Sequence, residues 1–332
     1  MTKNQSLLKT RFPDLAWFFD FPLGERSYFK VGGPAEIFYE ADDLTIFKDI
    51  LTFCDTESIS WTIIGGVSNV IIADAGIQGL VLRLNCKKTL VLEDNDEELL
   101  IESEMGIKTS VLVMETAKLR ATGLEGFVGV PGNLGGAIFN NAHYSNHLIG
   151  DHIESVTAFH VKQKQELVFS REQCNFAYEK SVFQTDKNLV ILKAIFKLAK
   201  AKPELIKNEL QSAQEKRLNS QPLNFPSSGC VFKNPVNTEA LKKTFPQFAD
   251  QQFIPAGFLI DQAGLKGKQI GQIAVSQKHA AFLVNLSCAK EADLAKASDI
   301  KALINLVKAT VKSKFNLELQ EEIFYLGQDK EN

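Results

Sequence analysis

The glycine-rich segment 123–137 constrains the fold of this chain more than any other stretch. Six glycines occupy the fourteen positions 123–136, in the sequence GLEGFVGVPGNLGG. Glycine inside a helix or strand costs backbone entropy and contributes no side chain to packing. So many glycines indicate a loop whose backbone approaches a flat or phosphorylated ligand closely. A glycine-rich loop with a purely structural role is the alternative.

A second pair, Gly65-Gly66, lies in the segment 61–72, where the pattern predicts a strand, a turn and another strand. Paired glycines let backbone N–H groups converge on an anion, and Ser68 and Asn69 can add donors. Taken alone, this segment also fits a plain hairpin, and it lacks the G-x-G-x-x-G dinucleotide fingerprint. Two glycine-rich loops in one domain favour a nucleotide or flavin site.

The segment 227–235 places one thiol, Cys230, between a Ser-Ser-Gly turn and a Val-Phe pair. The apolar pair predicts a short strand that enters a core, and Asn234-Pro235 predicts its end. Lys233 lies three residues on, and an ammonium group nearby favours the thiolate. Cys230 can therefore act as a nucleophile or a proton donor. The alternative is a buried small hydrophobe, which is the commonest fate of a free cysteine.

Composition and charge exclude several classes of protein. A chain of 332 residues is expected to form two or three domains. Its net charge of −3 argues against nonspecific nucleic-acid binding, which needs a basic face. No apolar stretch is long enough to span a bilayer, and no signal-type run follows the N-terminus. The cysteines show no zinc spacing and fit a reducing compartment; they are Cys54, Cys86, Cys174, Cys230 and Cys288.

We therefore expect a cytoplasmic protein that binds no metal, no membrane and no nucleic acid. Apolar periodicity predicts its helices and strands. Helices are expected over 44–54, 106–122, 203–219, 256–263 and up to Phe315, and strands over 36–40, 74–84, 90–102, 153–168, 189–198 and 319–327. The last strand would carry the two acids Glu321 and Glu322.

Seven segments, in their order along the chain, resemble the UDP-N-acetylenolpyruvoylglucosamine reductase (UDP-N-acetylmuramate dehydrogenase) family. They are 31–35 (VGGPA), 65–69 (GGVSN), 129–137 (GVPGNLGGA), 229–235 (GCVFKNP), 257–267, 276–285 and 322–327. No single segment is decisive, but their order and spacing over about 28–327 are highly specific. The spacing from Tyr178 to Cys230 leaves no room for a long insertion, which favours the shorter subtype.

The resemblance implies an α+β protein with a vanillyl-alcohol-oxidase-type (PCMH-type) FAD-binding fold and a C-terminal α+β substrate-binding domain. The expected parts are an N-terminal extension at 1–27, the FAD-binding domain at 28–200, a helix and linker at 201–226, and the substrate-binding domain at 227–330. The implied reaction reduces UDP-GlcNAc-enolpyruvate to UDP-N-acetylmuramate in peptidoglycan precursor synthesis. NADPH would be the electron donor and noncovalent FAD the cofactor, in a monomeric enzyme.

The resemblance also assigns site residues. Cys230 takes the position of the proton donor, where Ser is also common, and Glu322 takes that of the catalytic acid. Tyr178 matches the tyrosine of the substrate loop, and we expect it both to contact the substrate and to belong to the catalytic set, together with Glu179, which follows it. The other expected substrate contacts are Lys233, Asn234, Lys266 and His279. The cofactor is expected on Gly32, Gly65, Gly66, Val67, Ser68, Asn69, Pro131, Gly132, Asn133, Gly135, Gly136 and Ala137.

Two departures from the family pattern concern the substrate loop and its surroundings. The family usually has Tyr-Arg where this chain has Tyr178-Glu179, and a carboxylate cannot replace that cation in kind. Either Lys180 or another cation substitutes for it, or Glu179 is kept protonated beside Glu322. Our hypothesis from the sequence is that Lys180 meets the substrate carboxylate and Glu179 orients it. The family's Asn-Ala-Gly-Ala-Tyr-Gly segment is also altered, to NAHYSN at 141–146.

Two other functions fit parts of the pattern. An FAD-dependent oxidase of the same fold often carries a flavin-linking His or Cys in the first glycine-rich loop, and 65–72 has neither. A catalytically impaired nucleotide-binding homologue is supported by the missing arginine at position 179. The presence of Cys230 and Glu322 opposes that second alternative.

Overall fold

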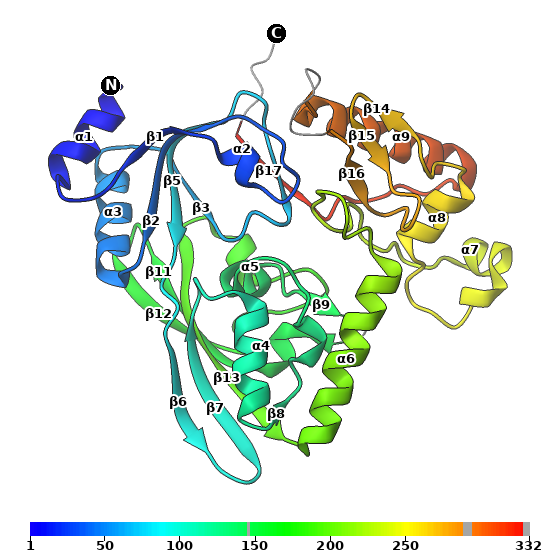
Figure 1. Ribbon diagram of the computed structural model, residues 1–332, viewed down its shortest axis with the longest axis horizontal. Coiled ribbons are helices and arrows are strands. Elements are labelled where there is room, and N and C mark those ends of the chain that lie inside the picture. Colours follow the sequence, from blue (N-terminus) through cyan, green and yellow to red (C-terminus); the bar gives the residue numbers. More distant parts are fainter. Residues whose placement is uncertain (145–146, 288–293, 328–332) are drawn as a thin grey trace. The chain divides into compact units, whose positions relative to one another are not determined.

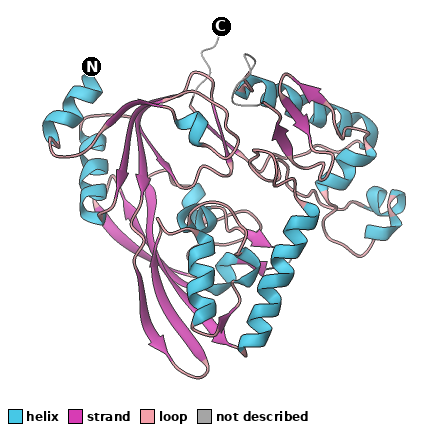
Figure 2. Ribbon diagram, viewed as in Figure 1, coloured by secondary structure: helices cyan, strands magenta, loops and turns pink. Residues whose placement is uncertain are grey.

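The computed structural model describes residues 1–144, 147–287 and 294–327, and the chain divides into two compact units. Unit 1 comprises Met1–Phe21, Ala35–Gly66 and Gln78–Arg217, and unit 2 comprises Pro22–Pro34, Val67–Ile77 and Leu218–Asn332. Both units contain helices and strands (Figure 2), in agreement with the predicted α+β class. Ser145 and Asn146 of the altered segment 141–146, and Cys288, lie outside the described residues.

Unit 1 is built on two sheets and the helices that pack against them (Figure 1). Its main elements are α1 (Lys3–Arg11), β1 (Phe18–Phe21), β2 (Ala35–Ala41), α3 (Leu44–Thr56), β3 (Trp61–Ile64), β5 (Ile77–Leu84), β6 (Thr89–Asp94), β7 (Glu98–Glu104), α4 (Thr109–Lys118), β8 (Ala121–Thr122), α5 (Leu134–Phe139), β9 (His143–Tyr144), β10 (His147–Leu148), β11 (Ile153–His160), β12 (Gln165–Ser170), β13 (Leu189–Lys200) and α6 (Pro203–Ser220).

The two sheets of unit 1 differ in how their strands pair. The four-stranded sheet has the order β1-β2-β5-β3, and within it β3 and β5 run parallel. The six-stranded sheet has the order β12-β11-β13-β7-β6, with β8 added to β13, and its strands pair antiparallel. Parallel β3 and β5 need a longer connection than a hairpin turn. The segment between them includes the first glycine-rich loop.

Local sequence explains where α3 begins and which face it buries. The Asp43 carboxylate accepts the N–H groups of Thr45 and Ile46 at 2.7 and 2.9 Å, which satisfies donors at the start of the helix. The buried residues of the helix recur every three or four positions, as expected for one apolar face against the sheet. They are Phe47, Ile50, Leu51 and Cys54.

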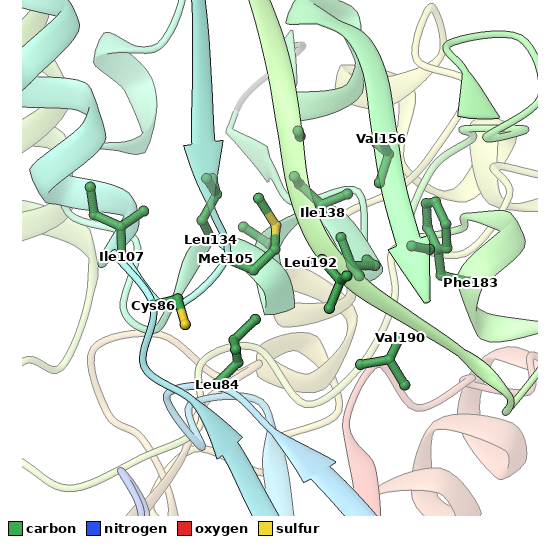
Figure 3. Close-up of a cluster of buried hydrophobic side chains, with 14 of the residues drawn as sticks. Leu84, Cys86, Met105, Ile107, Leu134, Ile138, Val156, Phe183, Val190 and Leu192 are labelled. Atoms are coloured by element: carbon green, nitrogen blue, oxygen red, sulfur yellow. The ribbon is translucent and has the colours of Figure 1, made fainter. Parts of the chain in front are cut away.

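The core of unit 1 fixes the position of α5, the helix that follows the second glycine-rich loop. Figure 3 shows part of one cluster of buried side chains to which α5 contributes Leu134 and Ile138. The neighbouring members come from β11, β13, the 3₁₀ helix η3 (Val182–Gln184), the end of β5 and the segments that directly follow β5 and β7. They are Leu84, Cys86, Met105, Ile107, Val156, Phe183, Val190 and Leu192. Full burial of one such aliphatic or aromatic side chain contributes about 1.5–3 kcal/mol, so α5 is firmly anchored to the sheet.

Unit 2 combines a small antiparallel sheet with the helices α2, α7, α8 and α9 and a separate parallel strand pair. Its elements are α2 (Leu23–Arg26), β4 (Val70–Ile72), α7 (Glu239–Thr244), α8 (Ala256–Gln262), β14 (Gln269–Ile270), β15 (Ile273–Val275), β16 (Leu283–Asn285), α9 (Ala297–Phe315) and β17 (Phe324–Leu326). The sheet has the order β14-β15-β16, and α9 packs on β14 and β15. Strand β17 pairs in parallel with β4, which comes from the N-terminal half of the chain.

Helix α9 shows why unit 2 needs that N-terminal segment. Asp74, two residues after β4, accepts the N–H groups of Ala297 and Ser298 at 2.7 and 3.1 Å. A carboxylate at a helix N-terminus satisfies free donors and complements the helix dipole. The buried stripe of α9 then faces the core of unit 2 with Ile300, Leu303, Ile304, Val307 and Val311. No helix in the described part of the chain is both long and apolar enough to cross a membrane.

The structure corrects several predicted elements. The single strand expected over 90–102 is the hairpin β6–β7, because Asn95 accepts the N–H groups of Glu97 and Glu98 at 2.9 Å and closes a turn. The strand expected over 153–168 is likewise the hairpin β11–β12. The helix expected over 106–122 is the shorter α4, and its last predicted residues form β8.

Two further corrections bear on the candidate site. The plain hairpin considered for 61–72 is wrong, because β3 pairs with β5 whereas β4 pairs with β17. The strand expected over 319–327 is limited to β17, so Glu321 and Glu322 precede it. In both cases a distant partner strand decides the pairing, and periodicity within a segment cannot identify that partner.

Candidate active site

The predicted site residues are distributed over both units. Unit 1 contains Tyr178, Glu179, Gly65, Gly66 and the segment 131–137. Unit 2 contains Gly32, Val67, Ser68, Asn69, Cys230, Lys233, Asn234, Lys266, His279 and Glu322. The first glycine-rich loop is itself divided, between Gly66 and Val67. Neither unit therefore holds the whole predicted set.

In unit 2, the segment around Cys230 lies as extended backbone between two other segments. Cys230 forms a β-bridge with Phe282 on one side. On the other side, the Glu322 N–H donates to the Val231 carbonyl at 2.8 Å. The predicted proton donor and the predicted acid thus occupy adjacent extended segments, although they are far apart in sequence. Both side chains are half-buried.

Neighbouring backbone and side chains hold this pair of segments in place. The side-chain amide of Asn69 donates to the Glu322 carbonyl at 3.3 Å, and the Phe324 N–H donates to the Asn69 carbonyl at 3.1 Å. The Ser228 hydroxyl donates to the Val70 carbonyl in β4 at 3.2 Å. Asn69, predicted as a cofactor residue, therefore also ties its own loop to the segment that carries Glu322.

The other predicted substrate residues of unit 2 have identifiable structural partners. The Asn234 side-chain oxygen accepts the N–H of Ala256 at 2.9 Å and so joins the Cys230 segment to the start of α8. Lys266 forms an ion pair with Asp261 at 2.7 Å. Burial lowers the pKa of His279, and the nearby positive charge of Lys266 adds to this effect. His279 is therefore mostly neutral at pH 7.

In unit 1, the two glycine-rich loops meet backbone to backbone. A Cβ atom at Gly66 would lie 2.4 Å from the Cα of Gly132, which leaves no room for a side chain. A Cβ at Gly65 would lie 3.7 Å from the backbone nitrogen of Gly136. At Gly136 a Cβ would meet no heavy atom within 4 Å, so there is open space beside the first turn of α5. Gly66 therefore allows the two loops to pack closely, whereas Gly136 leaves its backbone bare beside space that a ligand can fill.

Two enclosed polar atoms near these loops support a ligand site. Thr109 Oγ1 and Asn140 Oδ1 are buried and have no hydrogen-bond partner among the described residues. The Thr109 N–H donates to the Gly132 carbonyl at 3.3 Å, and Asn140 directly follows α5. A buried polar atom without a partner costs about 1–3 kcal/mol, which a polar ligand offsets by supplying that partner. The residues present therefore fit a flat cofactor with phosphate and polar ring groups, such as FAD.

The first half of the segment 123–137 has a different explanation. A Cβ atom at Gly126 or Gly129 would lie 2.5 Å from the side chain of Tyr144 or Arg217, respectively. A Cβ atom at Gly123 would likewise lie 2.5 Å from the imidazole of His152. These three glycines make room for side chains of the chain itself. The ligand interpretation therefore applies only to the later part of the segment.

Gly32 and Val67 in unit 2 also have structural reasons for their conformations. Both have positive φ, 111° and 55° respectively. A Cβ at Gly32 would lie 2.6 Å from the Cβ of Ile72, so the close approach of β4 requires glycine. The Val67 carbonyl accepts the Tyr28 N–H at 3.2 Å. A role for these two residues in cofactor binding stays a prediction.

Tyr178 and Glu179 form the tip of a tight turn in unit 1. Ala177 and Lys180 exchange both backbone hydrogen bonds, each 3.1 Å long. Glu179 has φ +52°, a left-handed conformation that costs a residue with a side chain about 1–2 kcal/mol. The side chain of buried Asn141 donates to the Ala177 carbonyl at 2.7 Å. The base of the turn is therefore fixed, and half-buried Tyr178 lies at its tip.

The carboxylate of Glu179 lies inside a polar cluster. Glu179 is only 5% exposed, and its Oε1 lies 3.7 Å from Nδ1 of His143. The imidazole ring lies 4.9 Å from the Tyr178 ring, centre to centre. The buried guanidinium of Arg217 lies 5.3 Å from the centre of the Tyr144 ring. Burial lowers the pKa of His143, the charge of Glu179 opposes this, and that of Arg217 adds to it.

The two departures from the family pattern, at positions 143 and 179, are thus in contact. Arg217 is not among the residues that the motifs single out, although α6 carries a signal for it. One face of α6 carries an apolar stripe at helical spacing, formed by Ile206, Leu210 and Ala213. The charged residue Arg217 occupies the next position of this stripe and ends it. Among the described residues, no group of three His, Cys, Asp or Glu side chains could hold a metal ion.

Two regions of the chain match known domains. Residues 35–163 match an FAD binding domain, and this range includes both glycine-rich loops. Residues 221–326 match the C-terminal domain of UDP-N-acetylenolpyruvoylglucosamine reductase. Together with the glycine-rich loops, these matches define an FAD-dependent oxidoreductase.

Whole-chain relatives give the family. A UDP-N-acetylenolpyruvoylglucosamine reductase of Clostridium novyi is 35% identical over 304 residues, 92% of this chain and 90% of the relative. One from Listeria monocytogenes is 34% identical over 328 residues, 97% of this chain and 99% of the relative. The crystal structure of the Thermus caldophilus enzyme has a TM-score of 0.71 at 26% identity, covering 94% of this chain and 98% of that chain.

The chain belongs to the UDP-N-acetylenolpyruvoylglucosamine reductase family, and its cofactor is FAD. The predicted family, fold class and cofactor are confirmed. The relatives named here are reductases, which favours a reductase over the oxidase alternative. The roles of the individual site residues stay predictions.

Proposed function

We propose that this protein reduces UDP-GlcNAc-enolpyruvate to UDP-N-acetylmuramate with NADPH as the electron donor. Relatives that are 35% and 34% identical over nearly the whole chain carry the name of this reductase. The observation that carries the residue-level proposal is the adjacency of Cys230 and Glu322 in unit 2. There the Glu322 N–H donates a hydrogen bond to the carbonyl of Val231, the residue that follows Cys230.

The reaction requires a proton donor next to a polar environment for negative charge. A hydride adds to the methylene carbon of the enolpyruvyl group, and negative charge develops on the carbon beside the carboxylate. FAD, held by the glycine-rich loops and the start of α5, would supply this hydride, and NADPH would be its source. Cys230 then donates a proton to the charged carbon, a task for which a thiol is a stronger acid than a hydroxyl. Glu322, when protonated, can hydrogen-bond to the charge on the substrate carboxylate.

The anionic groups of the substrate call for cations, and unit 2 offers two near its predicted site. We assign Lys233 and Lys266 to the diphosphate, with neutral His279 as a hydrogen-bond donor. Lys266 is paired with Asp261 at 2.7 Å, so diphosphate binding would exchange one anionic partner for another. Asn234 supports these residues through its bond to the start of α8. Tyr178 of unit 1 is the proposed contact from the substrate loop.

We further propose that the enzyme works as a monomer in the cytoplasm. For the compartment, the supporting observation is that the four described cysteines carry thiols rather than disulfides. Thiols persist in a reducing compartment.

Variants at Cys230 test the proposed role directly. Cys230→Ala should leave the reduction of FAD by NADPH nearly unchanged in stopped-flow measurements. It should slow reoxidation by UDP-GlcNAc-enolpyruvate by about 10²-fold or more, since positioned proton transfer contributes at least that much. Cys230→Ser should retain part of the activity, because a hydroxyl can fill the same role.

Equal losses in both half-reactions would instead indicate that Cys230 only packs. A wild-type protein that oxidises no NADPH in the presence of UDP-GlcNAc-enolpyruvate would contradict the proposed reaction itself. Acid or heat should release the FAD, because the first glycine-rich loop holds no linking residue. Flavin that stays with the denatured chain would contradict noncovalent binding.

A further inference from the structure

Buried Glu179 and Arg217 and half-buried His143 form a polar cluster in unit 1, which we name the Glu179 cluster. A carboxylate that is only 5% exposed requires nearby positive charge or hydrogen bonds, because an uncompensated buried charge is strongly destabilised. Lys180, the cation adjacent in sequence, is exposed. The imidazole of His143, in contrast, lies 3.7 Å from the carboxylate oxygen. The environment of Glu179 therefore comes from other segments of unit 1.

Arg217 is the buried cation of this cluster. Its side chain passes over Gly129, where a Cβ atom would lie 2.5 Å from Arg217 Cδ. Its guanidinium stacks on Tyr144, the residue after His143. The charges of Glu179 and Arg217 act on the same imidazole with opposite signs. One buried anion and one buried cation around this imidazole leave little net charge in the cluster.

The contact between His143 and Tyr178 links this cluster to the substrate loop. Their ring centres are 4.9 Å apart with an interplanar angle of 51°. Glu179 follows Tyr178 directly and is held at φ +52°. A residue in such a conformation persists only where its surroundings fix it, and such residues gather at functional sites. The Glu179 cluster supplies those surroundings at the tip of the turn.

We propose that His143 is a positioning residue for Tyr178, held between the Tyr178 ring and the Glu179 carboxylate, and that Arg217 rather than Lys180 balances the charge of Glu179. The inference rests on the proposed function only in taking Tyr178 as a substrate contact. It replaces our hypothesis from the sequence, in which Lys180 meets the substrate carboxylate and Glu179 orients it. Arg217, which ends the apolar stripe of α6, supplies the positive charge that the buried Glu179 carboxylate needs.

Titration of the His143 imidazole in the holoenzyme tests the cluster without any turnover. Glu179→Gln should lower the pKa of His143, because it removes the anion that favours the imidazolium. Arg217→Gln should raise that pKa, because it removes the opposing cation. Lys180→Ala should leave it unchanged. The values come from imidazole NMR signals, assigned with His143→Asn and referenced to exposed His147. An unshifted His143 in Arg217→Gln, or a shift in Lys180→Ala as large as in Glu179→Gln, would overturn the proposal.

Kinetics then test whether the cluster positions Tyr178. His143→Asn should lower kcat/KM for UDP-GlcNAc-enolpyruvate about tenfold, the loss expected when one polar contact of about 1.4 kcal/mol is removed. Reduction of FAD by NADPH should not change. The matched control, His147→Asn on the paired strand β10, should leave both half-reactions unchanged. FAD retention by each variant checks folding, and His143→Gln provides a second variant that can keep a hydrogen bond.

A double-mutant cycle separates coupling from independent damage. His143→Asn combined with Glu179→Gln should lose no more kcat/KM than the more damaging single change, because the two residues act as one unit. Losses that multiply would overturn the proposal. A wild-type enzyme that does not turn over UDP-GlcNAc-enolpyruvate would refute the proposed function alone, since the imidazole titration still decides whether the cluster exists.

Discussion

Individual thiols in this chain differ in reactivity because their surroundings differ. Burial raises the pKa of Cys54, Cys86 and Cys174 to about 12 each. All three lie in the core of unit 1, where they pack like small apolar residues. Cys230 is half-buried on an extended segment of unit 2. The alternative considered for Cys230, a cysteine that acts only as a buried small hydrophobe, therefore describes the three core cysteines.

Alkylation of the native holoenzyme should reflect this difference. At pH 8, a thiol with a pKa of about 12 is ionised to about one part in 10⁴, and only the thiolate reacts. Iodoacetamide should therefore modify Cys230 and leave Cys54, Cys86 and Cys174 unmodified in peptide mass spectra. Denaturant should make all of them reactive, which serves as the control. Modification of the core cysteines in the native protein would contradict this assignment.

Among the elements, α5 and the loop before it best connect packing with cofactor binding. Leu134 and Ile138 anchor the helix in the core of unit 1. Gly66 packs against the backbone of Gly132, whereas Gly136 borders open space. Two glycines of the same site thus have opposite reasons for lacking a side chain. One allows close packing, and the other leaves room for a ligand.

Alanine at each of these positions should separate the two reasons. Gly66→Ala should lower the free energy of unfolding by about 1–3 kcal/mol, because its Cβ would overlap backbone, and FAD content should fall with it. Gly136→Ala should stabilise the apoprotein by about 0.5–1 kcal/mol, since alanine is the better helix former. Its methyl group should nevertheless weaken FAD binding. Urea unfolding and flavin absorbance measure both effects, and equal behaviour of the two variants would contradict this explanation.

At the scale of the whole molecule, half-buried histidines in both units make stability depend on pH. Burial lowers the pKa of His143 and His152 in unit 1 and of His279 in unit 2. Unfolded histidine titrates near pH 6.5. Between that value and the lowered values of the folded state, the unfolded chain binds more protons than the folded one. Stability therefore rises with pH through this window and is lost as the pH falls through it.

Urea unfolding of the holoenzyme at pH 7.5, 6.5 and 5.5 should show this trend. The free energy of unfolding should change little between pH 7.5 and 6.5 and fall clearly by pH 5.5. Replacing His143, His152 and His279 together with Asn should flatten the profile in that range. Exposed His147→Asn, as the control, should leave it unchanged. If the free energy of unfolding of the triple variant falls with pH as steeply as that of the wild type, other groups cause the pH dependence.

The amino-acid sequence by itself determined several of the helices, the two glycine-rich loops and the family. Helical spacing identified α3, α6 and α9, because a helix must turn its apolar residues to one side regardless of what covers them. Turn residues located both glycine-rich loops and the end of α8 at Gly264, where φ is +80°. The order of the seven segments identified the reductase family. These signals are local, or depend only on order along the chain.

Only the tertiary structure decided which distant segments meet. It brought Glu322 beside the Cys230 segment, paired β4 with β17, and divided the first glycine-rich loop between the two units. The predicted domain boundaries describe continuous ranges, whereas each unit is assembled from three separated segments. The Glu179 cluster likewise unites the α5–β9 region, the 177–180 turn and α6. Such contacts depend on packing and charge compensation in three dimensions, which periodicity along a single segment does not encode.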